Sequence, residues 1–187
     1  SEAADAITDV LFGDVNPSGK LTMSFPFSVG QIPVYYNMKN TGRDAYSKDY
    51  RRYASNWIDC PNEPLYPFGY GLSYTTFEYS PVALSDTVMT VNGAVKAKVT
   101  VSNTGEYDGY EVAQLYIRDV VSSETRPVKE LKGFRRVFLK AGESAEIEFD
   151  ITPDMLGWHS VDQYNLSGSS EPLSARFVVE PGDFDIM

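Results

Sequence analysis

The side chains that could take part in chemistry are mostly carboxylates, and some of them lie close together in the chain. Asp44 and Asp49 form one such pair, and Asp59 and Glu63 form another. Two carboxyl groups at a fixed separation can act as acid and base, or as acid and nucleophile. Proximity in sequence does not set that separation, and loop carboxylates are ordinarily solvated. The pairs alone therefore establish no catalytic site.

Other residue types that commonly carry catalysis are scarce. The chain has one histidine, His159, and one cysteine, Cys60. A lone histidine cannot build a histidine metal site, and it more often has a structural role. The stretch from Gly13 to Lys20 is only superficially like a phosphate-binding loop, since five residues separate its glycines and Leu21 follows the lysine. We therefore expect no metal, no cofactor and no catalytic residue within this chain.

The formal net charge of −10 over 187 residues makes negatively charged binding partners unfavourable. An acidic surface repels phosphates, so binding to nucleic acid or to an anionic membrane is disfavoured. No apolar run approaches the roughly 20 residues that a membrane-spanning helix needs. We expect neither nucleic acid nor membrane as a partner.

Residues 27–63 show no sustained periodicity and are rich in aromatic and basic side chains. A loop of this length inside a compact region is uncommon and often functional. Aromatic faces beside arginines suit sugar rings, and the plainer alternative is that the rings pack the loop against another domain, as in an Ω-loop. The residues concerned are Tyr35, Tyr36, Tyr46, Tyr50, Tyr53 and Trp57, with Lys39, Arg43, Lys48, Arg51 and Arg52.

The first 25 residues predict one helix and one strand. Apolar residues recur at helical spacing over residues 2–12, and Gly13 follows as a C-terminal cap. Leu21, Met23 and Phe25 alternate with polar residues before Pro26 ends the pattern. So short a helix and strand cannot bury a core alone. We expect them to be the edge of a larger α/β domain that is absent here; the alternative is that they pack on the β region as an adornment.

Residues 64–77, with the sequence PLYPFGYGLSYTTF, predict a packed joint between two bodies. Proline and glycine exclude a plain helix or a central strand, and rings this dense are too costly to leave in water. A flexible linker would instead be rich in glycine and serine and poor in aromatics. We therefore expect the rings of this segment to be buried.

From Phe77 onward the pattern predicts antiparallel strands. Apolar and polar residues alternate over residues 95–102, 113–117 and 145–151, and turn sequences such as Asn92-Gly93 recur between such stretches. Several short strands over roughly 110 residues indicate a β-sandwich of immunoglobulin or fibronectin type III kind. The acidic residues Glu146, Glu148 and Asp150 fall on the outward face of one strand. The chain ends in what reads as a strand, so we also expect truncation there.

Five stretches together resemble glycoside hydrolase family 3. Residues 6–21 (AITDVLFGDVNPSGKL) and 29–37 (VGQIPVYYN) resemble the end of that family's α/β sandwich domain. Residues 65–77 look like its passage into a third domain, and residues 109–119 (GYEVAQLYIRD) and 126–134 (RPVKELKGF) look like the fibronectin type III-like domain itself. The matches cover nearly the whole chain in order, and bacterial periplasmic β-glucosidases are the most similar.

The resemblance implies a retaining exo-glycosidase that releases β-D-glucose or a related sugar from the non-reducing end of oligosaccharides or glycosides. It implies a nucleophile in an N-terminal barrel and an acid/base in the α/β sandwich, neither of which matches a position here. The partners would be those two domains of the same enzyme and a β-glucoside, and the location periplasmic or secreted. The fragment alone is predicted to be inactive.

Three parts of the chain follow from this interpretation. Residues 1–63 would be the remnant of the α/β sandwich with its connecting loop, residues 64–76 the interdomain joint, and residues 77–187 the fibronectin type III-like domain. The fold is thus expected to be mainly β. The loop could reach the rim of an active site, with Arg43, Arg52, Tyr53 and Trp57 as candidate substrate contacts. The competing hypothesis is a free-standing carbohydrate-binding or adhesion sandwich, which would not need the N-terminal helix and strand.

Overall fold

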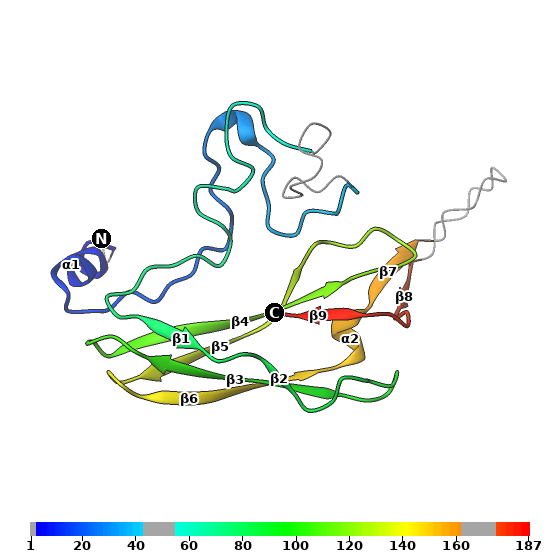
Figure 1. Ribbon diagram of the computed structural model, residues 1–187. Coiled ribbons are helices and arrows are strands. Elements are labelled where there is room, and N and C mark those ends of the chain that lie inside the picture. The colour runs from blue at the N-terminus through cyan, green and yellow to red at the C-terminus, as the bar shows by residue number, and fades with distance from the viewer. Residues whose placement is uncertain (1–2, 43–54, 162–174) are drawn as a thin grey trace.

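A computed structural model shows a β-sandwich with an extended N-terminal region on one side of it (Figure 1). The structure describes residues 3–42, 55–161 and 175–187. The helical elements are α1 (Ala3–Phe12), the 3₁₀ turn η1 (Val29–Gln31) and α2 (Pro153–Leu156). The strands are β1 (Phe77–Tyr79), β2 (Ala83–Leu84), β3 (Val95–Asn103), β4 (Gly109–Asp119), β5 (Glu130–Leu139), β6 (Ser144–Ile151), β7 (Trp158–Val161), β8 (Ala175–Val178) and β9 (Phe184–Ile186).

The strands form two main antiparallel sheets. In one, β3 pairs with β1, β2 and β6, and in the other, β4 lies between β5 and β9. A further pair joins β7 to β8. The predicted antiparallel sandwich is confirmed, and the predicted strands at residues 95–102, 113–117 and 145–151 correspond to parts of β3, β4 and β6.

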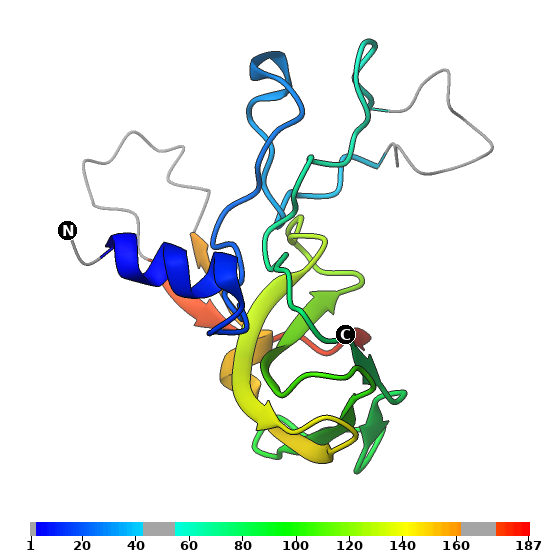
Figure 2. The same cartoon turned by 90° about the vertical axis from the view of Figure 1, so that its left-hand side faces the viewer.

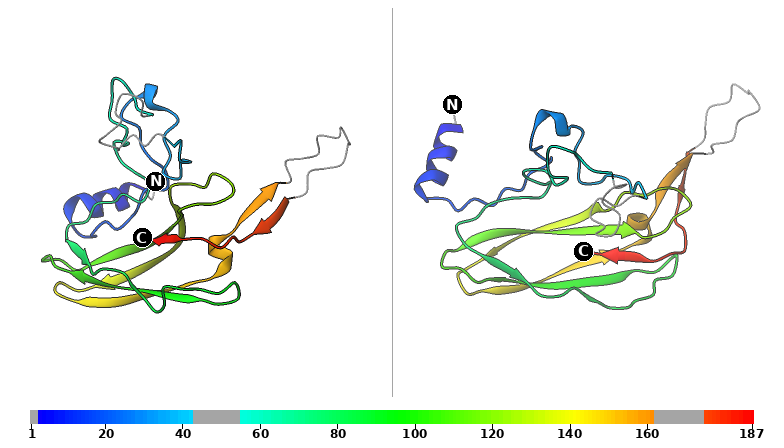
Figure 3. Two further views of the ribbon diagram at one scale, coloured as in Figure 1. Left: turned by 45° about the vertical axis from the view of Figure 1, so that its right-hand side comes forward. Right: turned by 45° about the horizontal axis from the view of Figure 1, so that its top comes forward.

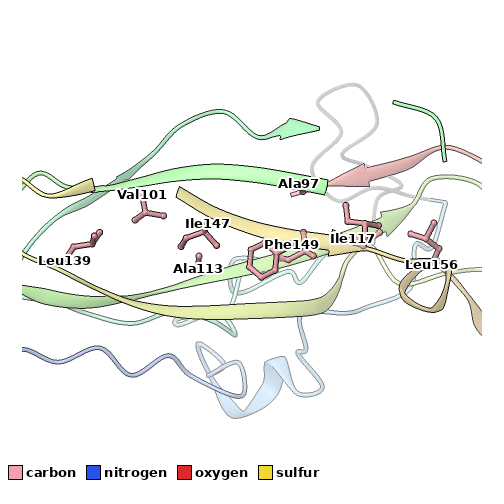
Figure 4. Close-up of a cluster of buried hydrophobic side chains, with 10 residues drawn as sticks. Ala97, Val101, Ala113, Ile117, Leu139, Ile147, Phe149 and Leu156 are labelled. Atoms are coloured by element: carbon pink, nitrogen blue, oxygen red, sulfur yellow. The ribbon is translucent and has the colours of Figure 1, made fainter. Parts of the chain in front are cut away.

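The core lies between the two main sheets, where alternate residues of facing strands meet (Figure 4). Inward residues of β4 are buried while their neighbours are half-buried or exposed, as period-two alternation requires. Each large apolar side chain buried in this way contributes about 1.5–3 kcal/mol to folding. The buried cluster comprises Ala97, Val101, Ala113, Leu115, Ile117, Leu139, Ile147, Phe149, Ile151 and Leu156.

The outward face of β6 is acidic, as predicted, and the neighbouring strand neutralises it. Lys98 Nζ lies 2.8 Å from Glu146 Oε1 and 3.2 Å from Glu148 Oε2, and Lys96 also contacts Glu148. Hydrogen bonds from these two lysines hold the pKa of Glu148 below its usual value. The acids of β6 are therefore part of a cross-strand charge ladder.

The predicted N-terminal helix is present as α1, and it stands away from both sheets (Figure 2). Gly13 follows it with φ of 86°, and its N–H donates to the carbonyl of Val10 at 3.3 Å, which gives the expected cap. The apolar residues Ile7, Leu11 and Phe12 are 59%, 72% and 81% exposed. The helix therefore does not pack on the sandwich as an adornment within this chain.

The predicted strand over residues 21–25 forms only in part. Leu21 N–H donates to the carbonyl of Tyr70 and Gly69 N–H donates back to Leu21, both at 2.8 Å, and Phe25 forms a single bridge with Tyr66. A continuous ladder is interrupted because the facing segment contains Pro67, which has no N–H, and Gly69, whose φ is 81°. The segment thus pairs with the joint at separate points rather than as a strand.

Both views of Figure 3 place α1 and η1 on the same side of the sandwich, over the sheet that contains β4 and β5. Contacts to the outward face of this sheet agree, since Arg136 on β5 donates to Ser18 Oγ at 3.3 Å. No helix in the described part of the chain is long and apolar enough to cross a membrane.

Candidate functional site

The connecting loop, residues 27–63, is the region in which the sequence places its candidate contacts. It is described over residues 27–42 and 55–63, where it contains η1 and otherwise lacks regular structure, as predicted. Arg43, Arg52 and Tyr53 lie outside the described residues. Trp57, the fourth candidate contact, lies within the described residues.

Trp57 presents a partly open indole that is fixed through its backbone. Its residue is 37% exposed. Its N–H donates to Asn62 Oδ1 at 3.0 Å, and its carbonyl accepts from Asn56 Nδ2 at 3.2 Å. An aromatic face that is open to solvent but held at its backbone can stack on the C–H face of a sugar ring with little ordering cost.

Gln31 closes the base of the connecting loop, and the sequence did not predict this role. Its side chain is fully buried, with 0% exposed. The amide Nε2 donates to the carbonyl oxygens of Pro61 at 2.8 Å and Glu63 at 3.0 Å, while Oε1 accepts from Phe27 N–H at 2.6 Å. The one signal in the sequence is a polar residue inside the apolar run 29–34. Gln31 therefore brings together the two ends of a loop whose intervening residues include Trp57.

The sandwich contacts the part of the connecting loop at residues 36–39. The backbone N–H of Val128, which lies between β4 and β5, donates to the carbonyl of Met38 at 2.8 Å, and Lys39 forms an isolated antiparallel β-bridge with Pro127. The ring of Tyr36 stacks on Phe68 with centroids 4.1 Å apart and meets Tyr116 of β4 edge-on at 5.9 Å. The connecting loop is thus held by the sandwich and by the joint together.

Residues 64–76, the predicted joint, contact residues 21–25 and strand β4, but several of their rings remain partly exposed. Phe68 is half-buried within the stack described above. Tyr66, Tyr70 and Tyr74 remain 43%, 37% and 48% exposed. Within this chain these tyrosines remain partly exposed, because residues 3–25 cover only part of the segment; their burial at a joint with a larger body stays a prediction.

Two polar centres fasten the N-terminal region to the joint and the sandwich. Asn16 Nδ2 donates to the carbonyl of Asp108 at 3.0 Å, and Asn16 Oδ1 accepts from Ser73 Oγ and Tyr74 N–H. Lys20 Nζ lies 3.1 Å from the buried carboxylate of Glu111. These contacts, which sequence reasoning missed, join segments more than 50 residues apart.

Glu111 also accepts from the hydroxyl of Tyr79 on β1 at 2.9 Å. Burial and the adjacent Glu111 carboxylate raise the pKa of Tyr79 above its usual value. The phenol therefore stays protonated as a donor, and Glu111 ties together β1, β4 and Lys20.

The remaining side chains that could take part in chemistry have structural partners among the described residues. His159 lies edge-on to Phe177 with centroids 5.4 Å apart, in agreement with a structural role. Ser123 Oγ donates to the Glu180 carboxylate at 2.5 Å, and the backbone N–H of Ser123 donates to the same carboxylate at 2.9 Å, so this pair fastens the loop. Within the described ranges no group of three or more His, Cys, Asp or Glu could hold a metal ion.

Comparison with known proteins matches two parts of the chain to family models. Residues 1–74 match the glycosyl hydrolase family 3 C-terminal domain, and residues 111–187 match the fibronectin type III-like domain. A periplasmic β-glucosidase of Salmonella typhimurium is 48% identical over 187 residues, which is all of this chain and 23% of the relative. A β-glucosidase of Bacteroides ovatus, BoGH3A, is 39% identical over 98% of this chain and 24% of its own length.

Solved structures agree with the sequence relatives. The crystal structure of a β-glucosidase from Listeria innocua in complex with isofagomine superposes with a TM-score of 0.82 at 40% identity, over 99% of this chain and 26% of that one. The chain spans about a quarter of the length of the proteins it matches. With its glycosyl hydrolase family 3 C-terminal domain match and β-glucosidase relatives that cover the whole chain, it belongs to glycoside hydrolase family 3.

Proposed function

We propose that the chain is part of a retaining, exo-acting β-glucosidase that hydrolyses terminal β-D-glucosyl residues from oligosaccharides or glycosides. The observation that carries this proposal is the 48% identity, sustained over the whole chain, to a periplasmic β-glucosidase. The same similarity supports a periplasmic or secreted location. The reaction needs neither metal nor cofactor.

The chemistry of such an enzyme requires two carboxyl groups about 5–5.5 Å apart, one as nucleophile and one as acid/base. We assign neither to this chain and place both in the remainder of the enzyme. The part played here is to shape and support the rim of the substrate site. The chain alone should therefore bind substrate weakly and hydrolyse nothing.

The remainder of the enzyme is the partner that we propose for the N-terminal region. The exposed apolar residues Ile7, Leu11 and Phe12 of α1 favour it, because a free-standing sandwich would gain nothing from an uncovered helix. In this arrangement residues 1–63 complete an α/β domain, residues 64–76 form the joint, and residues 77–187 form the fibronectin type III-like domain. The competing adhesion or sugar-binding module would leave α1 without a role.

Hydrolysis of a chromogenic β-glucoside by the full-length protein tests the proposed activity. Release of glucose first as the β-anomer, followed by proton NMR, would support a retaining mechanism, whereas first release of the α-anomer would indicate inversion. A full-length protein that folds but hydrolyses no β-glycoside would contradict the proposal and favour the binding module.

Trp57, with Arg43, Arg52 and Tyr53, is the proposed contact to the leaving-group side of the substrate. Trp57→Ala in the full-length enzyme should raise KM for oligosaccharides about three- to thirtyfold and change kcat little, because a stacking contact made equally in ground and transition states is lost. Tyr107→Ala, which removes an exposed ring between β3 and β4, is the control. An unchanged KM in Trp57→Ala would remove Trp57 from the site.

A further inference from the structure

A charged cluster lies where β4, the loop after it and β7 meet. Arg126 Nη2 donates to Glu130 Oε2 at 2.8 Å, and its Nε lies 4.0 Å from Asp119 Oδ2. The guanidinium carbon lies 4.9 Å from the centroid of the Trp158 ring. The side chains of Arg126 and Asp119 are only 11% and 5% exposed. A planar guanidinium that is stacked on one face and hydrogen-bonded at its edge has little freedom.

Arg126 lies in the loop of residues 120–129, which makes further contacts with the sandwich. Ser123 N–H and Oγ both donate to the Glu180 carboxylate, at 2.9 and 2.5 Å. Ser160 Oγ on β7 donates to Glu124 at 2.8 Å. Arg126 immediately precedes Pro127, which forms the β-bridge with Lys39 of the connecting loop. The cluster therefore fixes the part of the sandwich on which residues 36–39 rest.

Burying this charged cluster lowers the stability of the fold, because some of its polar atoms have no hydrogen-bond partner. Among the described residues, Asp119 Oδ1, Arg126 Nε and Trp158 Nε1 are buried without a hydrogen-bond partner. Burial also raises the pKa of Asp119, against the opposing influence of Arg126. Apolar residues at such sites are often at least as stable as a buried ion pair, whereas charged groups restrict the geometry. What these residues supply is thus a defined loop conformation.

We propose that Arg126 is a positioning residue for substrate recognition, which acts from the sandwich through Pro127 and Val128 on the arm of the connecting loop at residues 36–42. This inference rests on the proposed function, since the loop is taken to line the substrate rim. It gives the fibronectin type III-like domain a task in recognition in addition to folding. Arg126 itself touches no substrate.

The test uses Arg126→Met in the full-length enzyme, which keeps the length of the side chain but removes its charge and donors. KM for a glucose disaccharide should rise about three- to tenfold while kcat changes less than about twofold. Arg126→Lys keeps the charge but lacks the planar guanidinium, and its KM should fall between those of the parent enzyme and Arg126→Met. Arg118→Met is the matched control, because Arg118 lies near the end of β4, before the loop that carries Arg126, in an exposed pair with Asp185. Equal KM values in Arg126→Met and Arg118→Met would overturn the proposal.

Hydrogen exchange provides a readout that does not depend on activity. In Arg126→Met, amides of residues 36–42 and of Val128 should exchange about tenfold faster, while those of β3 and β6 keep their protection. Unchanged exchange in residues 36–42, or an equal loss of protection throughout the sandwich, would contradict a positioning role. A parent enzyme that hydrolyses no glycoside would refute the proposed function, and the exchange result would still decide whether Arg126 holds the loop.

Discussion

At the scale of single residues, the connecting loop depends on the carboxamide of Gln31. Its two donated hydrogen bonds and one accepted bond satisfy three backbone groups from both ends of the loop. A buried backbone group left without a partner costs about 1–3 kcal/mol. Gln31 thereby also constrains Trp57, because residues 61–63 carry the Asn62 side chain, which accepts a hydrogen bond from the backbone N–H of Trp57.

Gln31→Glu should release the loop without disturbing the sandwich. The substitution keeps the shape and the acceptor but places a carboxylate oxygen opposite the Pro61 and Glu63 carbonyls. We expect the amide of Trp57 to exchange about tenfold faster, measured by hydrogen exchange. Gln114→Glu is the control, since Gln114 donates to the Gly69 carbonyl at 3.1 Å and lies on β4. Equal exchange at Trp57 in Gln31→Glu and the parent would show that the contact does not constrain the loop.

Ionisation of Tyr79 should make the free energy of unfolding depend on pH in the alkaline range. Because the pKa of Tyr79 is raised in the folded state, the unfolded chain ionises first as the pH rises above about 10. Its contribution is therefore complete below pH 10 and is lost as the pH rises toward the folded-state pKa. In urea titrations between pH 9 and 11.5, the parent should lose stability more steeply than Tyr79→Phe. Parallel curves for the two proteins would exclude this linkage.

At the scale of elements, the joint and the N-terminal region fit together through a close backbone approach. A Cβ added to Gly71 would lie 2.3 Å from the carbonyl oxygen of Gly19, whereas one added to Gly19 would meet nothing within 4 Å. Only Gly71 therefore needs to lack a side chain at this crossing. The same contact positions Leu21 against Tyr70 and Gly69.

Gly71→Ala should separate residues 14–25 from the joint at a cost of about 1–3 kcal/mol. The tyrosines of the joint should report this change by near-ultraviolet circular dichroism, because the ring centroids of Tyr66 and Tyr70 are 5.3 Å apart and this arrangement would be lost. The near-ultraviolet circular dichroism transition should move to lower urea concentration. Gly19→Ala should leave it in place, and coincident transitions for both variants would refute the packing described.

Some of these elements were predictable from sequence and others were not, for physical reasons. The helix α1 and the strands β3, β4 and β6 carry clean periodic patterns, and the structure confirms them. Strand β5 was not predicted, because Leu115 pairs with Gly133 while Tyr116 pairs with Leu131. That shift inserts Lys132 as an extra residue and breaks the alternation. Gln31 and Arg126 act through tertiary contacts, which leave no periodic signal in the chain.

At the scale of the whole molecule, the sandwich is closed around its core while the region above it is open. The buried cluster belongs entirely to residues 97–156, and α1 and the loop arms lie outside it. A surface of exposed apolar residues on one side of a molecule marks a partner. The account therefore predicts that activity belongs to the complete enzyme and that this chain contributes support and recognition.

Turnover of 4-nitrophenyl β-D-glucoside by this chain and by the full-length enzyme, measured side by side, tests that claim most directly. The full-length enzyme should turn over at about 1–10³ s⁻¹, in the range of ordinary enzymes, and this chain should show no release of nitrophenol above the uncatalysed rate. Turnover by the isolated chain, or an inactive full-length protein with a folded α1 region, would contradict the account.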